Sequence, residues 1–145
     1  MGRAINSAVH RLLSMWTSPG EPTVEELLRL ERRGHGRQVV IDRTADLSFG
    51  VFGQWLAFPG RDVVQVSSGV PLPDRTIAHE LGHMVLGHRG AIPLKVDVRP
   101  NAVEAAALML CRAVDGGTSR VEREAEQFAS RLLSRITRTD HGLLQ

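Results

Sequence analysis

Residues 76–86 of this chain read TIAHELGHMVL, and two histidines and a glutamate are the only charged or titratable side chains in the stretch. The apolar residues on both sides of them predict an α-helix over about residues 74–88. Positions four apart on a helix lie one turn apart on the same face. His79 and His83 can therefore direct two imidazole nitrogens at one cation.

The His-Glu-x-x-His pattern is the signature of zinc metallopeptidases. Zn²⁺ accepts imidazole nitrogen, and a catalytic zinc site takes three protein ligands and leaves the fourth position to water. Glu80, next to the first histidine, would be the base that activates this zinc-bound water. The alternative is an ordinary amphipathic helix with two solvated histidines. The uncharged residues around the motif disfavour it, because they are what a buried active-site helix requires.

A third protein ligand has to come from elsewhere in the chain. The longer metzincin motif requires glycine at 86 and histidine at 89, where this chain has Leu86 and Arg89. We therefore expect a glutamate from a separate helix, and residues 122–129 read EREAEQFA. Glu122 is the predicted ligand, because it shares a helical stripe with small and apolar residues and so faces the core. These residues are Ala125, Ala129 and Leu133.

Two alternatives stay open for these glutamates. Residues 119–122 read SRVE, which is also a capping box in which Glu122 would bond back to the Ser119 amide. Glu126, one turn beyond Glu122 on the same face, is expected to orient a ligand histidine without touching the metal. An exchange of roles between Glu122 and Glu126 is the second alternative.

The whole chain, residues 1–145, is predicted to form one α+β domain. Helical spacing of apolar residues predicts N-terminal helices within about residues 4–34, the second beginning at Pro22, and C-terminal helices within about residues 101–137. Between about residues 38 and 67, short β-branched and aromatic runs predict a small antiparallel sheet. Its expected strands are Val39–Asp42, Phe49–Phe58 and Val63–Ser67.

Single residues add local detail to this prediction. Asp74 is the expected N-cap of the motif helix, and Gly87 or Gly90 is expected to end it. Gly50 and Gly53 mark a candidate bulge in the second strand.

The strand before the motif helix is the candidate substrate-binding element. Its residues Val63, Val64, Gln65 and Val66 would bind an extended substrate by adding it to the edge of the sheet. Such an edge would favour a locally unfolded target segment.

The composition is that of a globular protein and does not indicate nucleic-acid binding. Hydrophobic residues make up 42% and charged residues 23% of the chain, and the net charge of +2 comes from dispersed basic side chains. No apolar run is long enough to cross a bilayer and no signal-peptide pattern is present, so we expect a cytoplasmic protein without a membrane partner. Cys111, the single cysteine, can form no internal disulfide, which agrees with that compartment.

Residues 72–83 (LPDRTIAHELGH), residues 122–129 and the hydrophobic strand before the motif together resemble the ImmA/IrrE family of zinc metallopeptidases, grouped with the minimal gluzincins. The resemblance implies a zincin-like fold, in which the motif helix and the glutamate helix pack beside a small sheet. It also implies a zinc-dependent endopeptidase that cleaves a helix-turn-helix repressor. Glu126 differs from the family, which usually has a shorter polar residue there, such as asparagine. The alternative function is a zinc-binding module that binds a repressor or another partner without cutting it.

Overall fold

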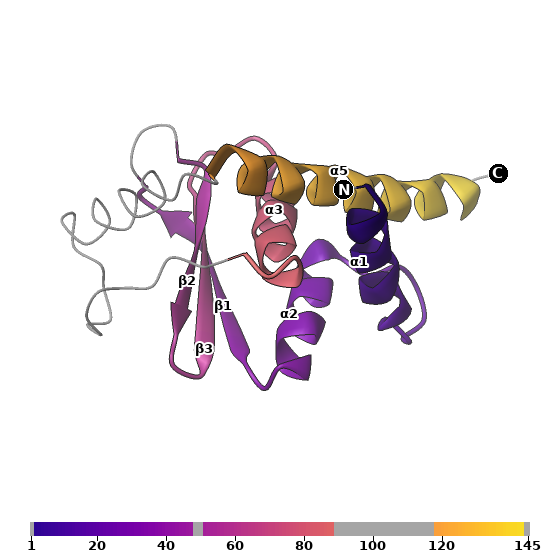
Figure 1. Cartoon of the computed structure of the whole chain (residues 1–145), viewed down its shortest axis with the longest axis horizontal. Helices are drawn as coiled ribbons and strands as arrows, with labels where there is room; N and C mark the ends of the chain where they lie inside the picture. Colours follow the sequence, from indigo (N-terminus) through magenta and orange to yellow (C-terminus); the bar gives the residue numbers. More distant parts are fainter. Residues whose placement is uncertain (1, 48–50, 89–117, 144–145) are drawn as a thin grey trace.

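The computed structural model of the chain describes residues 2–47, 51–88 and 118–143. In this part the fold is α+β, as predicted, with helices packed on a small sheet (Figure 1). The helices are α1 (Gly2–Ser14), α2 (Val24–Gly34), α3 (Pro73–Val85) and α5 (Thr118–Leu143), and the strands are β1 (Gln38–Ala45), β2 (Gly53–Phe58) and β3 (Arg61–Ser67). The helix expected over residues 101–114, with Cys111, lies outside the described residues.

The sheet is mixed, so the prediction of an antiparallel sheet is wrong. Its strand order is β1-β3-β2, with β3 parallel to β1 and antiparallel to β2. A tight turn at Pro59 and Gly60 joins β2 to β3, and the φ of Gly60 is +78°. Residue patterns along a strand report its buried face, but they do not report which strand will pair with it. Here the hairpin places β3, the last strand in sequence, in the centre of the sheet.

This strand order also rules out the predicted substrate edge. Both sides of β3 are hydrogen-bonded, to β1 and to β2. The residues Val63, Val64, Gln65 and Val66 therefore have no unpaired backbone edge to offer, and the prediction that they bind substrate by strand addition is wrong. Among the described strands, the outer edges belong to β1 and β2.

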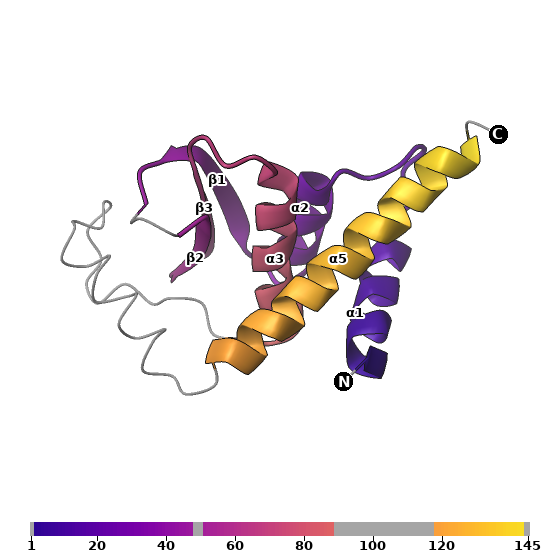
Figure 2. The ribbon, with the colours of Figure 1, turned by 90° about the horizontal axis from the view of Figure 1, so that it is seen from above.

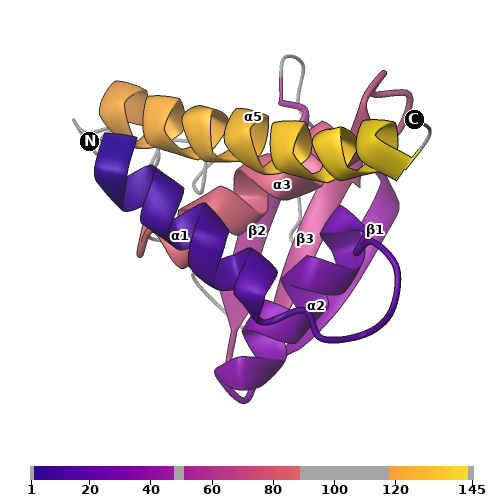
Figure 3. The ribbon, with the colours of Figure 1, turned by 90° about the vertical axis from the view of Figure 1, so that its right-hand side faces the viewer.

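The helices form layers on one side of the sheet. Helices α2 and α3 contact the strands, and α5 runs across α3 and α1 (Figures 2 and 3). The core between them is apolar, and every described element contributes to it. Its fully buried side chains include Ile5 and Leu12 of α1, Leu27 and Leu28 of α2, Val64 of β3, Ile77 and Leu81 of α3, and Phe128 and Leu132 of α5. This core holds α3 and α5 against each other.

Two helix starts differ from the predictions by one or two residues. Helix α2 begins at Val24 rather than Pro22, because Thr23 and Glu26 form a reciprocal cap. The Thr23 hydroxyl oxygen accepts from the Glu26 amide at 3.1 Å, and the Glu26 carboxylate accepts from the Thr23 amide at 2.9 Å. Helix α3 begins at Pro73 after Leu72, which makes no side-chain cap, so Asp74 lies in the first turn and is not the N-cap.

The helix ends are set by different features. Gly87, with a φ of +75°, follows the last residues of α3 as expected, whereas Gly90 lies outside the described residues. Helix α5 continues to Leu143, beyond the predicted end near residue 137. No helix in the described ranges combines the length and the apolar character that a membrane span requires.

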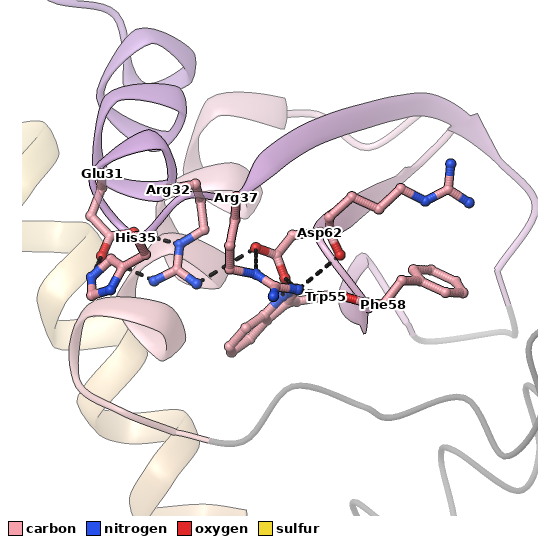
Figure 4. A network of polar contacts seen from close by, with 8 residues as sticks. Glu31, Arg32, His35, Arg37, Trp55, Phe58 and Asp62 are labelled. Carbon is pink, nitrogen blue, oxygen red and sulfur yellow. Dashed lines mark hydrogen bonds and ion pairs between the residues drawn. The ribbon is translucent and has the colours of Figure 1, made fainter.

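A buried charge network ties the end of α2 to the sheet (Figure 4). Asp62 of β3 is completely buried. Its carboxylate accepts from Arg37 Nε at 2.8 Å and from Trp55 Nε1 at 2.9 Å, and Arg32 Nη1 lies 3.5 Å away. Arg32 in turn pairs with Glu31. Because each charge has a partner, the network can be buried without an uncompensated ion.

Candidate metal centre

The site lies where α3 and α5 come into close contact. At Gly82 of α3, an added Cβ would lie 3.0 Å from Phe128 Cδ1 and 3.1 Å from the carbonyl oxygen of Ala125. Ala125 and Phe128 are completely buried. The missing side chain at position 82 therefore lets the backbones of the two helices approach, which brings the first turns of α5 over the histidines of α3.

Three donor groups converge at this crossing. His79 Nε2 lies 2.7 Å from Glu122 Oε2, His83 Nε2 lies 3.2 Å from Glu122 Oε1, and the two Nε2 atoms are 3.2 Å apart. Among the described residues, this is the group of histidine and carboxylate side chains whose ligand atoms lie within 4.8 Å of one another and could hold a metal ion. The sequence predicted the same three residues as ligands.

The second nitrogen of each imidazole also has a partner. His79 Nδ1 lies 2.9 Å from Glu126 Oε2, and Arg75 of α3 pairs with the other oxygen of Glu126 and donates to Ser130 at 2.9 Å. His83 Nδ1 lies 2.9 Å from Nδ1 of His88. Both rings are thus held through Nδ1 while Nε2 faces the shared point. Glu126, which the sequence predicts to orient a ligand histidine, is the residue in contact with His79 Nδ1.

The charges around this point favour a cation. Burial lowers the pKa of the His79 imidazole, but hydrogen bonds to Glu122 and Glu126 and the charge of Glu80 outweigh it and raise that pKa to about 9. Burial raises the pKa of Glu122, yet its contacts with His79 and His83 lower it overall, well below its usual range. The carboxylates therefore stabilise positive charge between the rings, whether a proton or a metal ion supplies it.

Glu80 lies beside this group and is almost completely buried, with 2% of its surface exposed. The start of β2 runs past it. A Cβ at Gly53 would lie 3.7 Å from Glu80 Oε1, would lie 3.1 Å from the carbonyl oxygen of Gln65, and would overlap the γ-methyl of Thr76. The β2–β3 register is regular from Gly53 onward, so Gly53 is not a bulge but a point of close approach. Gly50 lies outside the described residues.

A cleft of about 510 Å³ opens onto the site. One wall comes from the segment that enters β2, another from the segment before α3, and the floor from α3 and α5. Its lining residues are Val51, Phe52, Gly53, Val70, Pro71, Leu72, Arg75, Thr76, His79, Glu80, Glu122 and Glu126. Two of the three candidate ligands, His79 and Glu122, therefore share one cleft with the candidate base Glu80 and with Glu126, whereas His83 lies buried behind them.

Sequence reasoning overlooked three contributors to this site. From sequence alone, His88 is a residue near the helix end, Arg75 belongs to the 72–83 stretch but has no assigned role there, and Gly53 suggests only an irregular strand. Each contribution depends on a residue far away in sequence or on the path of the chain after α3. The strand residues 63–66, by contrast, were predicted to bind substrate but form the centre of the sheet.

Comparisons of the chain with family models, with curated proteins and with solved structures find no match.

Proposed function

We propose that this protein is a zinc-dependent endopeptidase that cleaves an extended segment of another protein. The observation that carries the proposal is the convergence of His79 Nε2, His83 Nε2 and the Glu122 carboxylate on one point. The buried Glu80 lines the same cleft as His79 and Glu122. Two imidazoles and a carboxylate from two helices are a ligand set of known catalytic zinc sites.

The donor atoms fit zinc in both distance and chemistry. Ligands at 2.0–2.1 Å from a tetrahedral ion are separated by about 3.3 Å. The two Nε2 atoms are 3.2 Å apart, which is already close to this spacing. Glu122 Oε1 lies 3.2 Å from His83 Nε2, whereas Glu122 Oε2 lies 2.7 Å from His79 Nε2, about 0.6 Å closer than the spacing of about 3.3 Å, so the Glu122 carboxylate has to move by about that amount. Two imidazoles in a set of three disfavour Mg²⁺ and Ca²⁺, which prefer oxygen ligands.

The side chains around the ligands support hydrolysis. Zinc held here would supply Lewis-acid polarisation of a peptide carbonyl and lower the pKa of water. Glu80 is the carboxylate positioned to take a proton from the attacking water and to return it to the departing amine. Glu126, held by Arg75, would keep the His79 ring oriented so that its Nε2 lone pair stays available.

The substrate is proposed to lie along β2 instead of β3. Gly53, at the start of β2, borders the cleft and lies next to Glu80. Among the described strands, β2 pairs only with β3, so its other edge can accept an extended peptide. The resemblance to the ImmA/IrrE family extends the proposal to a helix-turn-helix repressor as the substrate.

Metal analysis of purified variants tests the site. We expect stoichiometric zinc in the wild type and in Glu80→Gln, and loss of zinc in His83→Ala and Glu122→Ala. His10→Ala is the matched control, because His10 is exposed on α1. Retention of zinc in Glu122→Ala together with loss in Glu126→Ala would exchange the roles of the two glutamates. Folded wild type that takes up no zinc would overturn the proposal.

A peptide library analysed by mass spectrometry then tests the activity. The zinc-loaded wild type should cleave peptides, and Glu80→Gln should bind the same zinc without cleaving, because it lacks the base. Zinc-loaded wild type that binds a repressor but cleaves neither it nor the library would favour the non-cleaving binding module.

A further inference from the structure

The end of α3 brings a third histidine to the site. The His88 amide donates to the His83 carbonyl at 2.8 Å and the Gly87 amide to the Met84 carbonyl at 3.3 Å. With Gly87 at a φ of +75°, these two bonds form a Schellman motif. The motif turns the chain back along the helix, so that the His88 ring lies against the His83 ring, with centroids 5.1 Å apart.

The contact between the two rings is a hydrogen bond between nitrogens of the same type. His83 Nδ1 and His88 Nδ1 are 2.9 Å apart, so one of them has to donate and the other has to accept. The His83 side chain is 3% exposed and that of His88 is 10% exposed, which limits competition from water. On the far side of its ring, His88 Nε2 lies 3.6 Å from Glu124 of α5.

The metal-ligand geometry determines the direction of this bond. His83 Nε2 faces Glu122 and His79, so as a metal ligand it has to present a lone pair there. The His83 proton then resides on Nδ1 and is donated to His88, which accepts at Nδ1 and carries its own proton on Nε2, facing Glu124. One pair of tautomers thus satisfies the ring contact and leaves His83 Nε2 available for a cation.

We propose that His88 is a positioning residue for the metal ligand His83. Its neutral Nδ1 accepts the His83 Nδ1 proton, which fixes both the tautomer and the ring orientation of the ligand, and Glu124 fixes the tautomer of His88. His88 itself is not a ligand, because its nitrogens face His83 Nδ1 and Glu124. This inference rests on the metal site proposed above.

The two ligand histidines are therefore held by different chemistry. A carboxylate, Glu126, accepts from His79, whereas a neutral imidazole accepts from His83. Partners of this kind commonly change metal affinity by about 10–100-fold when they are removed. The hydrogen bond that holds the His83 ring therefore also depends on the turn at Gly87, because that turn directs the His88 ring toward His83.

Zinc affinity, measured by competition with a chromophoric chelator, tests the role of His88. We expect His88→Phe, which fills space but accepts no hydrogen bond, to weaken zinc binding by about 10–100-fold. His88→Asn, whose amide oxygen can accept from His83, should recover most of the affinity. His10→Ala is again the control, and thermal unfolding of the metal-free forms reports whether each variant keeps its fold.

Long-range ¹⁵N–¹H spectra of the histidine rings provide a second readout that a merely structural role would not change. The zinc-loaded wild type should show His83 protonated on Nδ1 and His88 protonated on Nε2. Glu124→Gln alters only α5 and removes the carboxylate that faces His88 Nε2. It should weaken zinc binding relative to the wild type, so it serves as a test even if the variants at position 88 do not fold, and unchanged zinc affinity in this variant would contradict the role of Glu124.

The outcomes separate the two proposals. Wild type without zinc affinity would overturn the metal site and the role of His88 with it. If the wild type binds zinc and folded His88→Phe binds it with the same affinity, the positioning role is overturned and the metal site stands. Protonation of His88 on Nδ1 in the zinc-loaded wild type would have the same consequence.

Discussion

Gly82 of α3 and Ala125 of α5 lie in direct backbone contact, so close that a Cβ at position 82 would come within 3.2 Å of the Ala125 Cα. Gly82 lies one helical turn after His79 and directly before His83, and Ala125 lies one turn after Glu122. The distance between the α3 and α5 axes at this point therefore determines whether Glu122 reaches both imidazoles.

Gly82→Ala should push α5 away from α3. We expect a loss of about 1–3 kcal/mol of unfolding free energy from overpacking, partly offset by the better helix propensity of alanine. Zinc affinity should fall together with stability. Denaturant unfolding and chelator competition measure the two effects.

Gly34→Ala is the matched control for this substitution. A Cβ there would lie 3.8 Å from the Met15 methyl, which is ordinary van der Waals contact. If Gly82→Ala were as well tolerated as Gly34→Ala and kept its zinc affinity, the close approach of the two helices would not be needed for the site.

Gly53→Ala should disturb the wall of the cleft next to Glu80. The new methyl would overlap the Thr76 γ-methyl, and we expect a destabilisation of about 1–3 kcal/mol. Thr76→Ser removes that γ-methyl, so the double variant should regain part of the stability, while the contact at 3.1 Å with the Gln65 carbonyl persists. A double-mutant cycle in urea measures the coupling, and strictly additive effects would contradict the steric explanation.

Asp62→Asn should destabilise the join between α2 and the sheet. The substitution removes the anion that faces Arg37 and Arg32 while keeping an oxygen for Trp55. Removing one partner of a buried ion pair costs roughly 3–5 kcal/mol, and we expect the lower end because an acceptor remains. Urea unfolding at pH 7 provides the measurement, with Asp46→Asn, on an exposed residue, as the control.

The wild type and Asp62→Asn should also differ in how their stability depends on pH. Burial raises the pKa of Asp62, but the hydrogen bonds from Arg37 and Trp55 and the charges of Arg37 and Arg32 outweigh it, so the folded pKa is lowered. A carboxyl with a lowered folded pKa contributes stability above its unfolded pKa of about 3.9, and this contribution is lost as the pH falls through the folded value. The stability difference between wild type and Asp62→Asn should be constant above about pH 5 and shrink below pH 4. A difference that does not change with pH would contradict the lowered pKa.

Metal removal should weaken the protein without unfolding it. The core side chains of α5, among them Phe128, Ala129 and Leu132, are completely buried independently of any ion. A ligand at 100 times its dissociation constant stabilises by about 2.7 kcal/mol, so a chelator should lower the unfolding temperature while the circular dichroism of the folded state persists. Unfolding by chelation at 25 °C would instead indicate a structural zinc.

Local sequence was sufficient for the features that depend on one helix. His79 and His83 face one point because helical geometry places residues four apart on one face, and the same periodicity directs Glu122 and Glu126 to a common side of α5. The α+β class followed from the change between helical and strand patterns near residue 38, since these patterns reflect local burial.

The pairing of the strands and the supports of the ligands were decided by tertiary structure. β3 lies between β1 and β2 although it follows both in sequence, because pairing depends on which faces the core buries, and no local pattern encodes this. Similarly, the sequence marked Gly87 as a helix end, but only the folded chain shows that the turn brings the His88 ring to His83.

Local sequence determined that His79 and His83 share one face of α3 and that Glu122 and Glu126 share one face of α5, because helix geometry is set within a few residues. The helix crossing at Gly82, the Gly53 wall and the His88 contact required the whole fold, because each depends on the distance between segments that only the common core holds together.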